Sequence, residues 1–127
     1  MENCTLEPIS GQAAALALSR AAARDPSRIA DAASVADSGA AFRLKTPAGE
    51  GVLVCKIRGG TQLWVCGAEA APGAGNLTDA GMALLEVMAD ENQCDRIAFQ
   101  TGRPGLVRVA KKHGYKVVGF IMEKSKN

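Results

Sequence analysis

Three short β-forming segments follow one another closely in the middle of the chain, and their spacing constrains the fold more than any other feature. They cover residues 41–46, 51–58 and 61–69 and are rich in residues that favour strands. The first gap is a turn at residues 47–50, and the second holds only Gly59-Gly60, which is typical of a two-residue hairpin. Because turns this short join neighbouring strands of opposite direction, the sequence predicts an antiparallel meander.

The third of these segments is apolar on both faces. Leu63 and Val65 alternate with Trp64 and Cys66, so neither face is suited to water. We therefore expect a central strand that is covered on both sides.

Helices and further strands flank the meander. Ser10 is a suitable N-cap for an Ala-rich helix, and Gly114 suits the left-handed cap of a closing helix. The expected elements outside the meander are strand 4–8, helix 10–23, helix 27–36, helix 77–91, strand 95–100, helix 106–113 and strand 115–122. This β-α-α-β-β-β-α-β-α-β order predicts a single α/β (α+β) domain over residues 1–127 with a mixed central sheet.

Bulk composition excludes several classes of protein. No apolar run approaches the roughly 18 residues of a membrane span, and the start of the chain does not resemble a signal peptide. The four cysteines are widely spaced and there is one histidine, so we expect no metal site. Cys55 and Cys66 lie in apolar strands, where we expect buried thiols in a reducing compartment, which indicates the cytoplasm.

Charge is unevenly distributed along the chain. Residues 102–127 carry seven basic and one acidic side chain, whereas the remainder carries eight basic and twelve acidic ones. A basic C-terminal face is suited to a phosphate-bearing cofactor or a nucleic acid, and it is equally suited to solvent alone. The scarcity of aromatic residues disfavours a stacking platform for single-stranded nucleic acid.

The closing helix and strand resemble those of the GCN5-related N-acetyltransferase (GNAT) superfamily, which often end in R-L-Y-x-K-x-G-F-x-x-x-G. The matching residues are Arg108, Val109, Ala110, Lys112, Gly114, Tyr115 and Gly119. The element order of the whole chain is also the GNAT order. The resemblance implies a GNAT-like sheet, acetyl-CoA as cofactor and acyl transfer to an amine. Small proteins of this fold that lack the full signature also occur in bacteriophages and prophages, so a phage protein is a further expectation.

The resemblance also assigns a cofactor site. GNAT enzymes carry Q/R-x-x-G-x-G/A before the main helix, where backbone N–H groups hold a diphosphate. Aligned on Leu84-Leu85, the signature positions fall on Asn76, Asp79 and Gly81. The cofactor-binding residues implied are Cys66, Ala68, Asn76, Thr78, Asp79, Ala80 and Gly81.

Asp79 stands where the family has glycine, and two interpretations remain open. A carboxylate near a diphosphate costs on the order of a few kcal/mol where both are partly desolvated. With Asn76 as N-cap, however, Asp79 is the third helical residue and stabilises the positive helix end. A nest at Gly73-Ala74-Gly75 is a third arrangement.

The family's catalytic groups have weaker counterparts. The family's tyrosine, which protonates the departing thiolate, aligns with Ala110, and alanine has no proton to donate. Tyr115 and His113 are the nearest substitutes. Either residue also fits a packing role. Glu69, at the end of the third meander strand, corresponds to the family's general base.

Three functions are consistent with these residues. The first is an N-acyltransferase that binds acetyl-CoA between strands 61–69 and 95–100. The second is a GNAT-fold binding or structural module without catalysis. The third is nucleic-acid binding through residues 103–126, which predicts strong salt dependence. The acyl acceptor stays open, and the two-sided apolar strands allow a homodimer.

Overall fold

The computed structural model describes residues 4–24, 32–71 and 73–126. Within these ranges, the elements are β1 (Thr5–Pro8), α1 (Gly11–Arg24), α2 (Ala32–Asp37), β2 (Ala40–Thr46), β3 (Gly49–Arg58), β4 (Gln62–Ala70), α3 (Thr78–Glu91), β5 (Arg96–Phe99) and α4 (Pro104–Lys112). The predicted mixed α/β architecture is confirmed. The start of the predicted helix 27–36 lies outside the described residues.

The strands form one sheet in the order β1-β2-β3-β4-β5, in which β1 to β4 are antiparallel and β5 runs parallel to β4. The predicted hairpin is formed, but Arg58 pairs with Gln62, so its loop is Gly59-Gly60-Thr61 and is one residue longer than predicted. Gly59 and Gly60 have φ values of 58° and 76°. Both angles are left-handed, as a type I′ turn requires, and glycine adopts them without steric cost. The meander is therefore determined by its turns.

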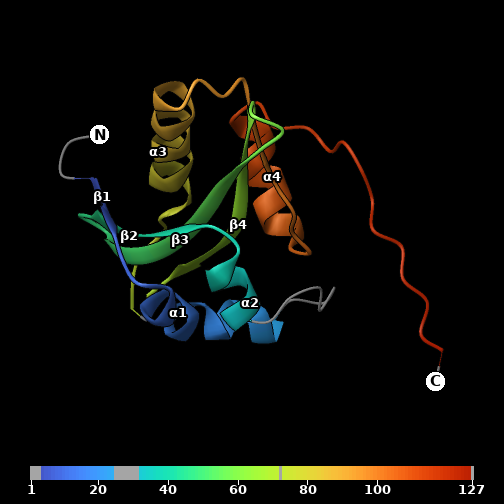
Figure 1. Ribbon diagram of the computed structural model, residues 1–127, viewed down its shortest axis with the longest axis horizontal. Helices are drawn as coiled ribbons and strands as arrows, with labels where there is room; N and C mark the ends of the chain where they lie inside the picture. The colour runs from blue at the N-terminus through green and yellow to red at the C-terminus, as the bar shows by residue number, and fades with distance from the viewer. Residues whose placement is uncertain (1–3, 25–31, 72, 127) are drawn as a thin grey trace.

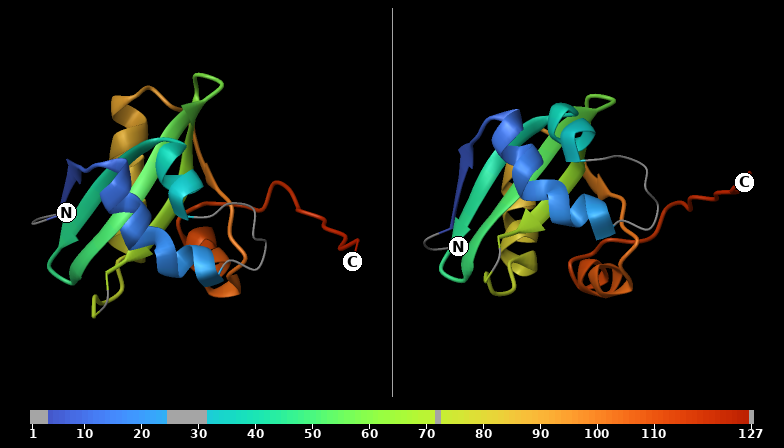
Figure 2. Two further views of the ribbon diagram at one scale, coloured as in Figure 1. Left: turned by 60° about the horizontal axis from the view of Figure 1, so that its bottom comes forward. Right: turned by 90° about the horizontal axis from the view of Figure 1, so that it is seen from below.

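Helices cover both faces of the sheet. Figure 1 shows α1 and α2 on one side of the sheet and α3 on the other. α4 contacts α3. Figure 2 shows the same layers from two further directions. Ala14 and Leu18, one turn apart on α1, are 0% and 2% exposed and pack on Val54 of β3. On the opposite face, Leu85 of α3 packs on Leu63 of β4.

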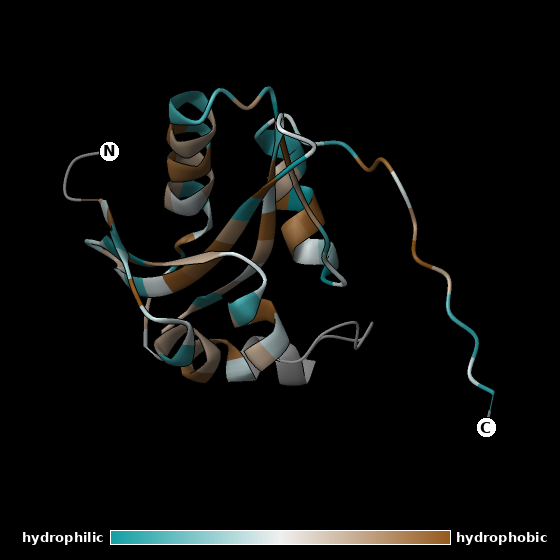
Figure 3. Cartoon of the chain, in the orientation of Figure 1, coloured by the Kyte–Doolittle hydropathy of each residue, from teal (hydrophilic) through white to brown (hydrophobic). Residues whose placement is uncertain are grey.

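Hydrophobic residues follow this layering. Figure 3 shows the most hydrophobic stretches of β3 and β4 in the middle of the molecule, between the helices. The prediction that β4 is a central strand with both faces covered is therefore confirmed.

The helix ends are set by local signals. Ser10 Oγ accepts a hydrogen bond from the Ala13 N–H at 3.1 Å, as expected for the cap of α1. Gly114, with φ of 90°, ends α4, and the Tyr115 N–H then donates to the Ala110 carbonyl at 3.1 Å. None of the helices in the described ranges is both long and apolar enough to span a membrane.

The predicted last strand, residues 115–122, is not formed. After Tyr115 the described chain has no helix or strand and runs away from the domain, as the red trace in Figure 1 shows. The segment has strand-forming residues, but a strand also needs a neighbour to bond its N–H and C=O groups, and no strand of the described ranges pairs with it. The prediction of this strand was wrong because strand propensity depends on neighbouring residues, whereas strand pairing depends on residues far away in the sequence.

Candidate functional site

The candidate site lies where β4 and β5 part. The two strands pair only from Gln62–Arg96 to Val65–Phe99, and β4 continues to Ala70. The segment Cys66–Ala70 therefore extends beyond the ladder with β5. β5 itself ends at Phe99, so among the described residues no strand pairs with Cys66–Ala68 on that side of β4. We call the space beside Cys66–Ala68, beyond the end of β5, the gap.

A β-bulge lies at the parting point. Val54 is opposite Gly67 and Cys55 is opposite Val65, so Cys66 is the extra residue on β4. Such a bulge redirects the backbone N–H groups that follow it. The structure thus places the predicted cofactor residues Cys66 and Ala68 in this irregular stretch, next to the gap.

The side chains of this stretch face different ways. Cys66 packs against the cluster beneath α1, and a Cβ at Gly67 would lie 2.6 Å from Val35 Cγ1 of α2. Ala68 is exposed and lies opposite Leu53, which packs towards α3. The Cys66 thiol is therefore a packing group, and it is the backbone of Cys66–Ala68 that a ligand in the gap would meet.

The loop between β4 and α3 is tied to the turn between β2 and β3. The Gly75 N–H donates to the Ala48 carbonyl at 2.8 Å, and the Ala74 N–H donates to the Ala71 carbonyl at 3.1 Å. Two of the three N–H groups of the alternative nest at Gly73-Ala74-Gly75 are therefore already used within the protein. This favours the start of α3 as the anion site.

The start of α3 differs by one residue from the expectation. The N-cap is Leu77, not Asn76, so Asp79 is the second helical residue. Asn76 still contributes, because its Oδ1 accepts the Thr78 N–H at 2.9 Å. The Gly81 N–H bonds the Leu77 carbonyl at 2.8 Å. By helix geometry, the N–H groups of Asp79 and Ala80 lack an acceptor within the helix and are the donors for an anion.

Asp79 contacts a residue that is distant in sequence. Its Oδ1 lies 2.6 Å from Nε2 of His113, at the end of α4. The Asp79 side chain is 73% exposed, whereas the His113 side chain is 28% exposed. The pair joins the ends of two helices and places a cationic group, when the imidazole is protonated, beside the carboxylate. No local pattern could have predicted this contact.

Tyr115 lies at the same parting point. Its ring packs on Phe99 with centroids 5.3 Å apart, and Phe99 is the last residue paired with β4. Its hydroxyl exposes less than 1 Å² and has no hydrogen-bond partner among the described residues. Burial, and then the charges of Glu86 and Cys55, raise the pKa of Tyr115. The Tyr115 side chain therefore holds its proton beside the gap. Ala110, the residue aligned with the family's tyrosine, is buried in α4.

Glu69 does not lie beside Tyr115. Glu69 is opposite Val52, which packs with the α1 cluster, and it shares a face of β4 with Gly67. Tyr115 instead packs on Phe99, which lies opposite Val65, and Val65 packs with the core cluster beneath α3. The structure thus places the two predicted catalytic residues on opposite faces of the sheet, with the gap between them.

None of the predicted site residues lines the hollow of about 240 Å³ that the structure contains beside α3 and β5. Its walls are Glu86, Ala89, Asp90, Cys94, Asp95 and Ile97. Three carboxylates repel an anion, so this hollow does not suit a diphosphate. Within the described ranges, no group of three or more His, Cys, Asp and Glu side chains could hold a metal ion.

Similar folds are found among solved structures. No protein-family model matches the chain, and no curated protein sequence matches it. A candidate acetyltransferase from Pyrococcus furiosus is 17% identical with a TM-score of 0.64, over 96% of this chain and 99% of that one. A Trypanosoma brucei acetyltransferase is 16% identical with a TM-score of 0.58, over 97% and 99%.

A third structure contains a bound compound. AAC(6')-Iy, solved with the bisubstrate analogue CoA-S-monomethyl-acetylneamine, is 12% identical with a TM-score of 0.55, over 99% of both chains. At identities this low, the likeness establishes the fold and leaves the chemistry to be argued from the residues of this chain.

Proposed function

Because the chain has the fold of the GCN5-related N-acetyltransferases, we propose that it transfers an acyl group from acetyl-CoA to an amine. The observation that carries the proposal is the parting of β4 and β5 directly after Val65–Phe99, with the bulge at Cys66 and the start of α3 behind it. This arrangement provides backbone donors in the middle of a sheet and a helix N-terminus for phosphate.

The hydroxyl of Tyr115 is the proposed proton donor at the thioester end. It is buried without a hydrogen-bond partner among the described residues, and because it exposes less than 1 Å², the ring must turn before the hydroxyl bonds a ligand in the gap. An acetyl thioester, when bound, supplies the acyl group and a thiolate leaving group. The backbone N–H groups of Cys66–Ala68 stabilise the negative charge that develops on its carbonyl oxygen.

The two catalytic side chains act from opposite faces. Glu69, on the α1 face, removes the proton from the attacking amine as the new C–N bond forms. Tyr115, on the α3 face, gives its proton to the departing sulfur as the C–S bond breaks. One proton is taken and one is given, so an amide and a thiol are the products. The raised pKa of Tyr115 keeps the donor protonated at neutral pH.

The residues at the start of α3 fit the diphosphate of the cofactor less well. The N–H groups of Asp79 and Ala80 provide donors, but the Asp79 carboxylate repels a diphosphate at the same helix end. His113, 2.6 Å from that carboxylate, offsets the repulsion when it is protonated. We therefore propose that His113 is a positioning residue for cofactor binding.

A GNAT-fold binding module without catalysis is the alternative. It is favoured by Ala110 at the family's tyrosine position and by the carboxylate at the start of α3. In that case the Asp79–His113 contact is purely structural and holds α4 against α3.

Thiol release from acetyl-CoA in the presence of a panel of amines tests the proposal. Tyr115→Phe and Glu69→Gln should each lower kcat by roughly 100-fold, the usual scale for a general acid or base. Glu91→Gln, an exposed carboxylate at the far end of α3, is the matched control and should retain full activity. Calorimetric titration with CoA accompanies the assay. Micromolar binding without turnover would refute catalysis and favour a CoA-binding module, whereas no binding at millimolar CoA would refute the acyltransferase and favour a module whose partner is not CoA.

A further inference from the structure

One face of the sheet carries basic side chains near the β3–β4 hairpin. Leu63 of β4 and Ile97 of β5 lie opposite each other and belong to the core cluster under α3. Because side chains alternate along a strand, the residues next to them in sequence lie on the other face of the sheet. At the hairpin end, the residues of that other face are Lys56, Arg58, Gln62, Trp64, Arg96 and Ala98. We call Lys56, Arg58, Trp64 and Arg96 the basic face.

The cations of the basic face are open to a partner. Lys56, Arg58 and Arg96 are exposed, and Trp64 is half-buried. Within the described ranges, no carboxylate lies within ion-pair distance of Lys56 or Arg58. Arg96 Nε lies 3.6 Å from Asp95 Oδ1, but both side chains are exposed, and such a pair is weak in water. Lys56 and Arg58 are therefore available to bind an anion.

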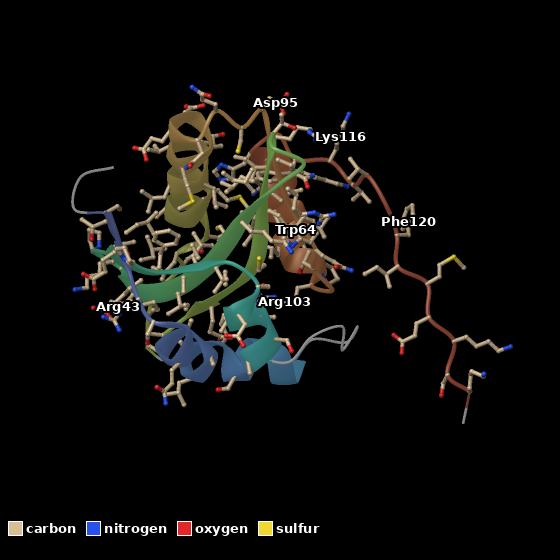
Figure 4. All side chains as sticks on the ribbon, in the orientation of Figure 1. Arg43, Trp64, Asp95, Arg103, Lys116 and Phe120 are labelled. Carbon is tan, nitrogen blue, oxygen red and sulfur yellow. The ribbon has the colours of Figure 1, made fainter. Side chains whose placement is uncertain are left out.

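Trp64 adds an apolar surface between these charges. It is the only tryptophan of the chain, and Arg58 Cζ lies 4.3 Å from the centroid of its ring. This cation–π contact holds the guanidinium and the indole against each other. Figure 4 shows Trp64 on the side of β4 that is away from α3. Tryptophan and arginine are the residues that contribute most often to binding energy at protein interfaces, so the pair suits a docking surface.

The stability of the sheet does not explain why these charges lie together. Lys56 and Arg58 are next neighbours on this face of β3, and Arg58 and Arg96 flank Gln62 of β4 from its two sides. Positions related in this way are roughly 7–10 Å apart, and like charges on neighbouring positions of one face repel each other. An anionic partner removes that repulsion.

The helices on the same face favour a helix as the part of the partner that binds. Val54, two residues before Lys56 on β3, packs in the cluster beneath α1. A further helix extends this layer over Trp64. Arg58 and Arg96 are two strands apart, roughly 10 Å, and residues i and i+7 of a helix lie on one face at the same separation.

The number of charges favours a protein over a nucleic acid. A nucleic acid is bound through many phosphates and, when single-stranded, through a series of stacked bases. The basic face has three cations and one aromatic ring, which match two or three carboxylates and one apolar side chain.

We propose that the basic face docks an acidic amphipathic helix of a partner protein. Carboxylates at positions i and i+7 of that helix pair with Arg58 and Arg96, and apolar side chains at i+3 and i+4 pack on Trp64. Lys56 contributes to electrostatic steering, so binding weakens as salt rises. The basic face contains none of the residues assigned to acyl transfer, so this proposal does not rest on the acyltransferase.

Fluorescence of Trp64 is the first test, because no other tryptophan is present. The probe is an Ala-rich helical peptide of about 18 residues, with glutamates at i and i+7 and leucines at i+3 and i+4. We expect a Kd of about 10–100 μM at low salt. A peptide with glutamine in place of both glutamates should bind at least about tenfold more weakly. No binding at about 1 mM peptide, or equal binding of the two peptides, would overturn the proposal. Tighter binding of an oligothymidylate than of the acidic peptide would do so in favour of a nucleic acid.

Calorimetry on variants locates the surface. Lys56→Gln combined with Arg58→Gln should lower the affinity for the acidic peptide at least about tenfold. Lys111→Gln combined with Lys112→Gln removes the same charge from exposed positions on α4 and should retain the affinity. Equal losses from the two variants would attribute binding to net charge and refute the surface.

Charge reversal gives a test whose expected result is a gain. Arg58→Glu combined with Arg96→Glu should abolish binding of the acidic peptide and create binding of the version that has lysines in place of its glutamates. Circular dichroism shows whether the variant is folded. A folded variant that binds neither peptide, or that still binds the acidic one, would contradict the pairing with Arg58 and Arg96.

Discussion

The two ends of the candidate site differ in the groups that form them, which are backbone groups at one end and include side chains at the other. At the end that we propose for the thioester, which we call the thioester end, the groups that matter are backbone: a bulge at Cys66 and a ladder between β4 and β5 that stops after Val65–Phe99. At the end that we propose for the diphosphate, which we call the phosphate end, they include side chains, and the Asp79 carboxylate occupies the helix start beside His113. The first end follows from the fold, whereas the second depends on individual residues.

This difference indicates where function is most easily gained or lost. A bulge in a central strand is held by the packing of both faces, so surface substitutions leave it in place. A single charge at a helix end changes anion binding by a kcal/mol or so without altering the fold. We therefore expect substitutions at the two ends to separate stability from cofactor affinity.

The largest expected effect is on the thioester end. Leu63 is 2% exposed on β4 opposite Ile97 of β5, so it supports the strands where they still pair. Leu63→Ala should lower the free energy of unfolding by about 2–5 kcal/mol through lost burial and the cavity left behind. Leu16→Ala, at a side chain 76% exposed on α1, should change it by less than about 0.5 kcal/mol. Urea denaturation compares them, and equal losses would show that Leu63 is not a core contact.

The next effect is on pH dependence. Burial, with a smaller contribution from the charge of Cys66, raises the pKa of the Cys55 thiol from 9.0 to about 12. The unfolded chain therefore releases this proton at a lower pH than the folded one, so stability falls as pH rises above about 9. The slope is about 1.4 kcal/mol per pH unit for one group, and Tyr115 adds to it at higher pH.

Urea unfolding between pH 7.5 and 10.5 measures this slope. Cys55→Ala should be less stable at neutral pH but should show a shallower decline. Cys94→Ala, at a half-buried position beyond α3, is the control and should retain the parent slope. A parent whose stability is constant up to pH 10.5 would contradict the burial of Cys55.

The smallest expected effect is on the phosphate end. Asp79→Asn removes the charge at the start of α3 and should tighten CoA binding roughly fivefold, about 1 kcal/mol. Stability should fall by less than about 1 kcal/mol, since the Asp79 side chain is largely exposed. Asp90→Asn, at the other end of α3, should leave CoA affinity unchanged. Equal gains from the two variants would attribute the effect to net charge, and a loss of affinity in Asp79→Asn would show that Asp79 supports the site.

Most of the meander and its helices could be predicted from the sequence because their signals are local. Gly59 and Gly60 determine the β3–β4 turn, Ser10 caps α1 and Gly114 ends α4. Each signal acts within about four residues of the structure it predicts. The N-cap of α3 is Leu77, one residue later than predicted. Asn76 lies one position before this cap, and its side chain accepts the Thr78 N–H.

The candidate site was predicted less completely. The resemblance placed Cys66, Ala68 and the start of α3 near a ligand, and the structure places them beside the gap or behind it. It did not predict that Glu69 and Tyr115 lie on opposite faces, because face depends on the bulge at Cys66. A single extra residue reverses the alternation of every side chain that follows.

The sequence by itself determined most of the strands and helices, where most of them end and how they are ordered, because propensities, caps and tight turns are properties of neighbouring residues. Only the tertiary structure decided that His113 meets Asp79, that the Tyr115 hydroxyl is buried beside the parting strands and that residues 116–122 form no strand. Each of these depends on groups that are far apart in the chain or that must be supplied by a neighbouring strand, and local preference carries no information about either.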